Sequence, residues 1–272
     1  MAKQRAVKKN VYRDAFGHLY FLKRSLIFIL GAFTYNRYNG YNKLKISGGE
    51  GLEDLPNTNV LFVSNHQTYF ADVFAMYHVF CASKNGFVNT IKNPIYLLNP
   101  KIDFYYIAAE ETMKNNFLTK LFAYTGAIMV KRTWRDSGKD VNRKVDINEV
   151  GNIQKALQNG WVVTFPQGTT TAFAPGRRGT ALMVKKSKPI VVPVVINGFR
   201  RAFDKKGLKL KKMGVRPTMH FKPPLDIDYE NEDYDSIMKK IMDGIEQSPE
   251  FLKVKPIEDI LQDREPQDFF DE

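Results

Sequence analysis

The sequence of 272 residues contains one cysteine, Cys81. One cysteine excludes an internal disulfide, makes a cysteine-rich zinc site implausible and favours a reducing compartment. Long apolar runs are also missing near the N-terminus, where the uninterrupted stretch extends only from Leu26 to Phe33. This is far short of the roughly 20 residues that span a bilayer. No small-residue cleavage pattern follows it, so we expect no secretory signal peptide. A Gly-x-Ser-x-Gly elbow, which carries the nucleophile of many serine hydrolases, is absent too.

Acidic residues are scarce in the first 225 residues, which hold thirteen Asp and Glu against thirty-six Lys and Arg. The remainder reverses this balance with sixteen acidic and five basic side chains, so the net charge of +12 combines +23 and −11. The basic part favours a polyanionic partner, for which anionic lipid and nucleic acid are candidates. A soluble protein with a basic face is the alternative. No RNA-binding or DNA-binding module is recognisable, so we expect no nucleic acid partner.

Residues 1–45 interleave ten basic side chains with aromatic and aliphatic residues, and Asp14 is the single acidic residue. A basic helix with a wide apolar face is typical of helices that lie in a membrane interface. There, Lys and Arg meet anionic headgroups and Tyr lies at the boundary. We therefore predict a membrane-associated helical segment, with the protein peripheral or monotopic at the cytoplasmic face of the membrane. A helix packed on the domain that follows is the alternative.

The stretch that organises the chain is residues 60–72. The apolar run Val60–Val63 predicts a buried strand, and polar residues including His66 follow it. The apolar pattern that resumes afterwards predicts a helix with Asp72 in its first turn. On one regular helix, six residues would set His66 and Asp72 roughly 240° apart. They can meet only if His66 lies in a loop that doubles back. The carboxylate would then fix the tautomer of the imidazole and leave its other nitrogen as a base. A polar loop beside an ordinary helix-start aspartate is the alternative.

Strand patterns alternate with helical patterns, which predicts an α/β fold with a mostly parallel central sheet flanked by helices. Further strands are predicted at Phe87–Ile91, Asp103–Ala108, Ala127–Val130, Trp161–Phe165 and Ile190–Ile196. Pro193 indicates that the last of these is an edge strand or contains a bulge. The basic residues 200–216 predict a surface hairpin. Glycine and proline breakers and the shift in charge predict an N-terminal segment at 1–45, a core domain at 46–228 and an acidic C-terminal helix and tail at 229–272.

Polar and basic residues follow two of the predicted strands. Lys131 and Arg132 would suit a phosphate or carboxylate at a strand's C-terminal end. Residues 166–171, Pro-Gln-Gly-Thr-Thr-Thr, form a glycine turn that can direct backbone N–H groups at an anion or oxyanion. Arg177 and Arg178 then open a helix. Solvated charge is the alternative for these cations.

Taken in order, four blocks within residues 60–196 resemble the glycerolipid acyltransferases, best known from the 1-acylglycerol-3-phosphate (lysophosphatidate) acyltransferases. The blocks are Asn65-His66-Gln67 with Asp72, Gly126-Ala127-Ile128 with Arg132, Phe165-Pro166-Gln167-Gly168-Thr169, and Val192-Pro193-Val194. Four blocks in the same order are far more specific than any one of them.

The resemblance implies an O-acyltransferase that moves an acyl chain from acyl-CoA or acyl-ACP to the hydroxyl of a lysolipid at an anionic membrane surface. His66 would be the general base and Asp72 would orient it; a thioester is already activated, so no enzyme nucleophile is required. The residues that the likeness assigns to substrate binding are Asn65, Arg132, Gln167, Gly168 and Thr169. Backbone N–H groups around Gly168 and Thr169 are candidate donors to the oxyanion. We expect no cofactor and no metal, and acyl carrier protein is a candidate partner.

Three departures from the family pattern concern the catalytic pair and the acceptor side. Five residues, rather than the usual four, separate His66 from Asp72. The family glutamate is Gln167, and Thr170 stands where an arginine commonly follows, a loss for which Arg177 or Arg178 could compensate. These changes keep open an acceptor other than lysophosphatidate, such as a lyso amino-acid lipid. A non-catalytic module that binds lipid surfaces is the remaining alternative.

Overall fold

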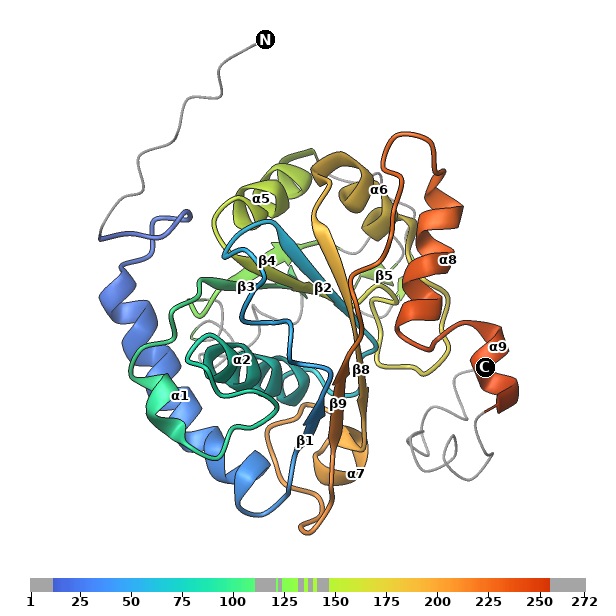
Figure 1. Ribbon diagram of the computed structural model, residues 1–272. Helices are drawn as coiled ribbons and strands as arrows, with labels where there is room; N and C mark the ends of the chain where they lie inside the picture. Colours follow the sequence, from blue (N-terminus) through green and yellow to red (C-terminus); the bar gives the residue numbers. More distant parts are fainter. Residues whose placement is uncertain are drawn as a thin grey trace.

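The computed structural model describes residues 12–110, 121, 124–131, 135–136, 139–140 and 147–254. Its centre is a seven-stranded sheet with the strand order β1-β9-β8-β2-β7-β3-β4 (Figure 1). These strands are β1 (Lys45–Ser47), β2 (Val60–Ser64), β3 (Phe104–Ala109), β4 (Ala127–Val130), β7 (Trp161–Thr164), β8 (Ile190–Asn197) and β9 (Thr218–Phe221). The five strands from β8 to β4 are parallel, β9 is antiparallel to β8, and β1 is parallel to β9. The prediction of a mostly parallel α/β sheet is confirmed.

Helices cover both faces of this sheet (Figure 1). They are α1 (Tyr20–Asn39), α2 (Ala71–Ser83), the 3-10 helix η1 (Pro94–Leu97), α5 (Ile147–Leu157), α6 (Arg178–Ser187), α7 (Phe199–Ala202), α8 (Tyr234–Gly244) and α9 (Pro249–Val254). Helix α2 packs on one face, with α1 and η1 against it, whereas α5, α6 and α8 pack on the other. A small separate ribbon pairs β5 (Arg135–Asp136) with β6 (Lys139–Asp140).

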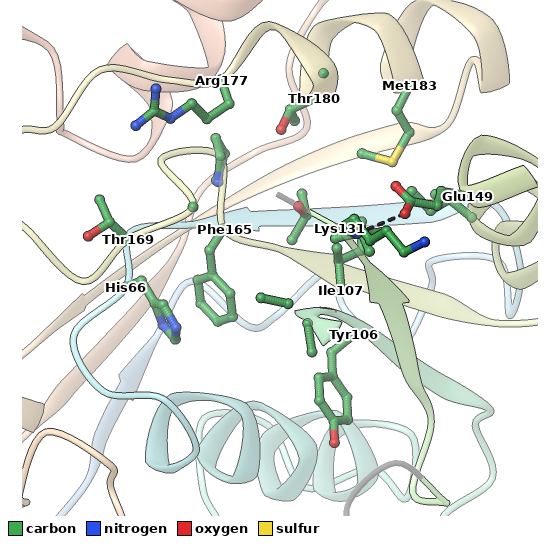
Figure 2. A pocket seen from close by; sticks show the side chains of 18 of the residues that line it. His66, Tyr106, Ile107, Lys131, Glu149, Phe165, Thr169, Arg177, Thr180 and Met183 are labelled. Carbon is green, nitrogen blue, oxygen red and sulfur yellow. Dashed lines mark hydrogen bonds between the residues drawn. The ribbon is translucent and has the colours of Figure 1, made fainter. Parts of the chain in front are cut away.

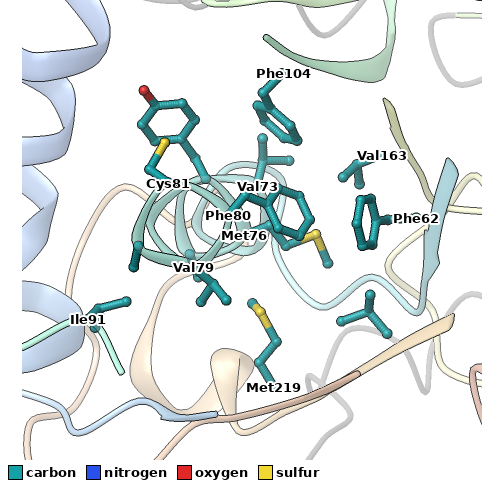
Figure 3. Packing of buried hydrophobic residues seen from close by; sticks show 14 of the residues in the cluster. Phe62, Val73, Met76, Val79, Phe80, Cys81, Ile91, Phe104, Val163 and Met219 are labelled. Atoms are coloured by element: carbon teal, nitrogen blue, oxygen red, sulfur yellow. The ribbon is translucent and has the colours of Figure 1, made fainter. Parts of the chain in front are cut away.

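Strand β2 is buried on both faces, which explains why no polar residue interrupts the apolar run Val60–Val63. Val60 and Phe62 belong to the core cluster on the α2 side, and Leu61 and Val63 belong to the cluster on the α5, α6 and α8 side. All four are fully buried, and the ring of Phe62 lies 4.3 Å from that of Phe80 in α2 (Figure 3). Each such side chain stabilises the fold by about 1.5–3 kcal/mol through burial. Because β2 packs against the core on both faces, the end of the strand from which the polar loop begins is held in place.

Two strand predictions were wrong in part. Residues 87–91 form no strand; Asn89 adopts a left-handed conformation (φ 54°), which interrupts an extended run before η1. Pro193 lies in an interior strand, between β2 and β9, rather than at an edge. The carbonyl of Pro193 accepts a hydrogen bond from Lys222 N–H just beyond the end of β9. The proline nitrogen faces that same side, so its missing N–H lies just beyond the end of the β8–β9 ladder and the pairing of β8 with β2 is unaffected.

The N-terminal segment forms the single long helix α1, and residues 1–11 of the predicted segment lie outside the described residues. One face of α1 is buried, and it includes Lys23, whose ammonium lies 3.2 Å from the carboxylate of Asp14. Lys23 is therefore paired inside the protein, which corrects the expectation that it meets headgroups. In the described part of the chain, no helix is both long enough and apolar enough to cross a membrane. The acidic tail at 255–272 also lies outside the described residues.

Candidate active site

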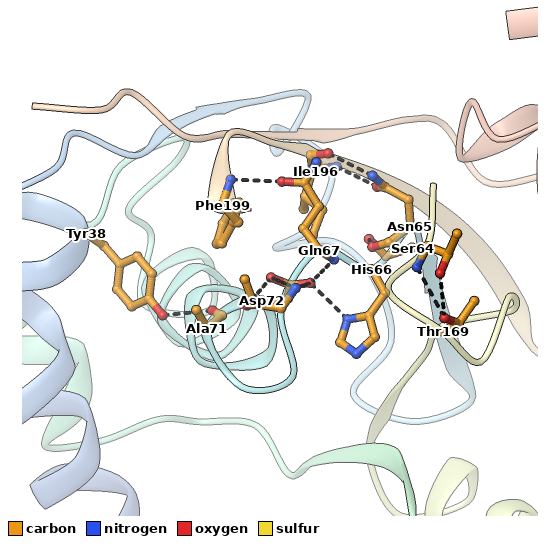
Figure 4. A network of polar contacts seen from close by, with 12 residues as sticks. Tyr38, Ser64, Asn65, His66, Gln67, Ala71, Asp72, Thr169, Ile196 and Phe199 are labelled. Atoms are coloured by element: carbon orange, nitrogen blue, oxygen red, sulfur yellow. Dashed lines mark hydrogen bonds and ion pairs between the residues drawn. The ribbon is translucent and has the colours of Figure 1, made fainter. Parts of the chain in front are cut away.

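The loop between β2 and α2 doubles back and brings His66 onto Asp72 (Figure 4). His66 Nδ1 lies 2.9 Å from Asp72 Oδ2, so the contact predicted from the sequence is present despite the longer spacing. The side chain of Asp72 is fully buried, whereas 14% of the His66 side chain is exposed. The aspartate therefore lies behind the imidazole, and the imidazole reaches the surface of the site.

Asp72 is held by the loop that it closes. The backbone N–H of Gln67 donates to Oδ2 (2.6 Å), the N–H of Thr68 donates to both oxygens (3.0 and 3.2 Å), and the Thr68 hydroxyl donates to Oδ1 (2.7 Å). An ionised carboxylate only accepts hydrogen bonds, so His66 must carry its proton on Nδ1. Its Nε2 makes no hydrogen bond with any residue that the structure describes. This nitrogen is the unprotonated one and can act as a base.

Phe165, the residue that follows β7, stacks on the other side of the imidazole. The two ring centroids lie 3.8 Å apart and the ring planes differ by 20°. With Asp72 at one edge and Phe165 on one face, the orientation of His66 is determined by two independent contacts.

His66 opens into a pocket of about 400 Å³ at the C-terminal ends of β7, β3 and β4 (Figure 2). Its interior is lined mainly by apolar side chains from β3, β4, α5 and α6, namely Ile107, Val130, Val150, Ile153 and Met183. Charged residues also line it: Lys131 after β4 with Glu149 beside it, and Arg177 and Arg178 at the start of α6. The guanidinium of Arg178 lies over the ring of Tyr234 in α8. The pocket thus joins a base, an apolar space and a group of cations, which suits an anionic molecule with a hydrocarbon part.

Two predicted substrate-binding residues hold the framework of the site instead. Asn65 accepts from the N–H of Ile196 and donates to its carbonyl (both 2.8 Å), so its amide ties the loop to β8. Gln167 donates through Nε2 to the carbonyl of Ala174 (2.9 Å) and to Gln247 Oε1 (3.3 Å), and it is almost completely buried. Neither residue lines the pocket. A glutamate at position 167 would place a charge against these acceptor oxygens, which explains the neutral side chain here.

Most of the other residues predicted to bind substrate lie at the pocket. Gly168, Thr169, Arg177 and Arg178 line it, whereas Arg132 lies outside the described residues. The N–H of Gly168 closes a turn onto the carbonyl of Phe165 (2.9 Å), with Gly168 at a φ of 66°. The N–H of Thr169 has no partner among the described residues. Of the two expected oxyanion donors, Thr169 is therefore the one whose N–H is not already used.

Comparison with protein families decides the class of this site. Residues 48–197, more than half of the chain, match the family model described as Acyltransferase. The chain belongs to this family. The matched range contains every residue that lines the pocket around His66. The resemblance found in the four sequence blocks is confirmed, and the protein is an acyltransferase.

One solved structure similar to this acyltransferase is the crystal structure of the 1-acyl-sn-glycerophosphate (LPA) acyltransferase PlsC from Thermotoga maritima. The similarity has a TM-score of 0.51 and 16% sequence identity, and it covers 86% of this chain and 80% of that chain. At this identity the likeness shows a shared fold. Comparison with curated proteins finds no match.

Sequence reasoning assigned no role to two residues that shape the catalytic centre of the acyltransferase. Phe165 was noted only as part of a motif. It directly follows β7, the neighbour of β2, and this position places its ring against the side chain of His66, which follows β2. Thr68 was not singled out, although its hydroxyl lies four residues before Asp72 and donates to that carboxylate. The signal from Phe165 depends on knowing that β2 and β7 are neighbours, whereas that from Thr68 is local to the loop.

A second histidine of the acyltransferase is structural. His78 is fully buried in α2 and lies 2.9 Å from both Thr34 Oγ1 and the Tyr96 hydroxyl, so it ties α2 to α1 and η1. Burial lowers the pKa of His78 to about 3. Among the described residues, no group of three or more His, Cys, Asp or Glu side chains is placed to hold a metal ion.

Proposed function

We propose that this acyltransferase moves an acyl chain from an acyl thioester, acyl-CoA or acyl-ACP, to the free hydroxyl of a lysophosphatidate-like lysolipid in membrane lipid biosynthesis. The observation that carries the proposal is the arrangement of His66. Its Nδ1 is hydrogen-bonded to a buried carboxylate, and its Nε2, without a hydrogen-bond partner among the described residues, lies at a pocket that combines apolar and cationic residues.

In the proposed reaction, Nε2 of His66 removes the proton from the acceptor hydroxyl while the oxygen attacks the thioester carbonyl. Asp72 stabilises the resulting imidazolium through Nδ1–H. The tetrahedral intermediate then collapses, the carbon–sulfur bond breaks, and the imidazolium returns the proton to the leaving thiolate. The new ester and a free thiol balance the reaction, and no covalent acyl-enzyme is needed. The N–H of Thr169 is the candidate donor to the oxyanion.

This function is tested by measuring thiol release and ester formation with acyl-CoA and with acyl-ACP, each in the presence of lysolipids in anionic vesicles. We expect thiol release that depends on the lysolipid. A non-catalytic lipid-binding module would instead bind the vesicles and release no thiol with either donor.

The cations Lys131, Arg177 and Arg178 support an acceptor with an anionic headgroup. A phosphate or a carboxylate would each form charge-assisted hydrogen bonds with them. The neutral Gln167 and Thr170 remove charges that the family pattern places nearby, which favours testing a lyso amino-acid lipid beside lysophosphatidate. The acceptor for which kcat/KM is higher identifies the headgroup.

We expect Arg178→Ala to raise KM for the anionic lysolipid about tenfold and to leave kcat nearly unchanged. A hydrogen bond to a charged group contributes roughly 1.5–3 kcal/mol, and this one would be present in substrate and transition state alike. Steady-state kinetics with the lysolipid and with an uncharged monoacylglycerol check this. Lys186→Ala is the matched control, because Lys186 is an exposed cation of the same helix that does not line the pocket. Equal effects of Arg178→Ala on both acceptors would contradict a role in headgroup binding.

We further propose that the outer face of α1 docks on the anionic cytoplasmic surface of the membrane. This face exposes large apolar side chains, including Phe21 (84% exposed) and Phe33 (68%). The neighbouring segment at η1 continues the apolar surface with Ile95 and Leu98. Side chains of this kind favour the boundary of the hydrocarbon region.

We expect the double substitution Phe21→Ser and Phe33→Ser to weaken co-sedimentation with anionic vesicles by at least about tenfold. Burial of one phenylalanine contributes roughly 1.5–3 kcal/mol, which converts to about tenfold or more. Leu252→Ser is the control, because Leu252 is also exposed but belongs to α9, on the far side of the molecule from α1 (Figure 1). Unchanged vesicle binding by the α1 variant would exclude this face as the docking surface.

A further inference from the structure

The segment after α7 lies against the catalytic loop. Residues 203–210, called the supporting loop here, are closed by a bridge between Phe203 and Leu210 and by the side chain of Asp204. Oδ1 of Asp204 accepts from the N–H groups of Leu208 (2.8 Å) and Lys209 (2.9 Å). The prediction of a surface hairpin at 200–216 was therefore incomplete, because the segment begins with a helix and folds back onto the core.

The supporting loop supplies hydrogen-bond partners for the loop between His66 and Asp72, which is one residue longer than the family spacing. The N–H of Tyr69 donates to the carbonyl of Lys205 (3.1 Å), and the N–H of Phe70 donates to the carbonyl of Lys206 (3.0 Å). Phe70 is the residue directly before α2, and it is itself buried. Buried N–H groups without partners would each cost about 1–3 kcal/mol. These two bonds therefore stabilise the longer connection from His66 to Asp72.

Gly207 brings the two loops into direct contact. A Cβ atom at this position would lie 2.4 Å from the backbone nitrogen of Ala71, 2.9 Å from its Cβ and 2.9 Å from Thr68 Oγ1. Backbone atoms cannot move aside cheaply, and Gly207 also has a φ of 75°, which favours glycine. The Thr68 hydroxyl is the one that donates to Asp72. Any side chain at position 207 would thus press on the groups that hold the aspartate.

The supporting loop is itself fixed on the side of α1. The guanidinium of Arg37 donates to the carbonyl of Leu208, and the buried ring of Phe203 lies 5.5 Å from the ring of Tyr38. The Tyr38 hydroxyl donates to the carbonyl of Ala71 (2.8 Å), as Figure 4 shows. The first residue of α2 is therefore held by α1 on one side and by Gly207 on the other.

We propose that the supporting loop, through Gly207, positions the enlarged loop between His66 and Asp72 for acyl transfer. Gly207 is a positioning residue, since it contacts neither the pocket nor the imidazole and acts through Thr68 and Ala71. The inference rests on the proposed function of His66 as general base. The basic segment that follows α7 would then have a structural role, which is to position the catalytic loop, in addition to its positive charge.

The test compares Gly207→Ala with Gly214→Ala. Gly214 lies in the same basic segment with nearly the same φ (77°), but a Cβ there would have no atom within 4 Å. Strain at a positive φ is thus matched, and only the contact with the catalytic loop differs. We expect Gly207→Ala to lower kcat about 10-fold to 100-fold, as misplacement of catalytic groups does, with KM within about twofold of wild type. We expect Gly214→Ala to change kcat by less than about twofold. Equal kcat for both variants would overturn the proposal.

Hydrogen exchange provides a readout that does not depend on activity. We expect the amides of Tyr69 and Phe70 to lose protection in Gly207→Ala and to keep it in Gly214→Ala. Asp204→Ala, which loosens the supporting loop without adding atoms, should lower protection at the same amides and lower kcat with KM retained, even if Gly207→Ala fails to fold. Retained protection and kcat in Asp204→Ala would overturn the proposal. An inactive wild-type protein with protected amides would instead refute the acyl-transfer function and leave the loop contacts standing.

Discussion

We expect His66→Ala to lower kcat for acyl transfer by about 10²-fold to 10⁴-fold, the usual contribution of a positioned general base. The variant removes Nε2, the atom proposed to take the proton from the acceptor hydroxyl. The imidazole lies at the mouth of the pocket and makes one hydrogen bond to the part of the chain that the structure describes, so the fold should be retained. Thiol release from acyl-CoA in the presence of lysolipid vesicles measures the rate, and a thermal melt checks folding.

His220→Ala is the matched control for this substitution. His220 is an exposed histidine of β9 that pairs with Ser47 and lies outside the pocket. We expect its removal to leave kcat within about twofold of wild type. Undiminished transfer by folded His66→Ala would remove the mechanism. Vesicle binding should be the same in both variants, because the proposed docking face is on α1.

Asp72→Asn should have the second largest effect on catalysis, and it should also destabilise the protein. An asparagine has nearly the same shape but presents an N–H₂ group toward one or more of the donors around it. In a related arrangement of serine, histidine and aspartate, the same change lowers kcat by roughly 10⁴-fold because the histidine adopts the wrong tautomer. We expect a decrease on the order of 10³-fold here, measured by the same thiol-release assay.

The loss of stability follows from the four donors that converge on this carboxylate. One buried donor left without an acceptor costs about 1–3 kcal/mol, so we expect a decrease of that size in the free energy of unfolding. The double variant His66→Ala with Asp72→Asn should be no slower than His66→Ala alone, since the two side chains act as a unit. Additive losses in kcat would show that Asp72 acts on the reaction independently of His66.

Several parts of this architecture follow from local patterns. The strands at 60–64 and 161–164 are short apolar runs that end in polar residues, and burial on both faces of a parallel sheet requires such runs. The polar residues that follow them gather at one edge because the carboxyl ends of parallel strands meet there. The edge position predicted from Pro193 was wrong, because whether a strand lies at an edge depends on which strands lie beside it. The roles of Asn65 and Gln167 also differed from expectation, because their hydrogen-bond partners at Ile196 and Gln247 are distant in the chain.

By itself, the sequence determined the class of fold and the family and singled out His66 and Asp72 as candidates, because these depend on the order and spacing of side chains. Tertiary structure alone decided how five intervening residues can still bring the pair within 2.9 Å. That outcome depends on the backbone carbonyls of Lys205 and Lys206 and on the close approach of the two loops that Gly207, which has no side chain, allows. Backbone carbonyls are the same in every residue, so a pattern of side chains cannot reveal which of them will meet a distant loop.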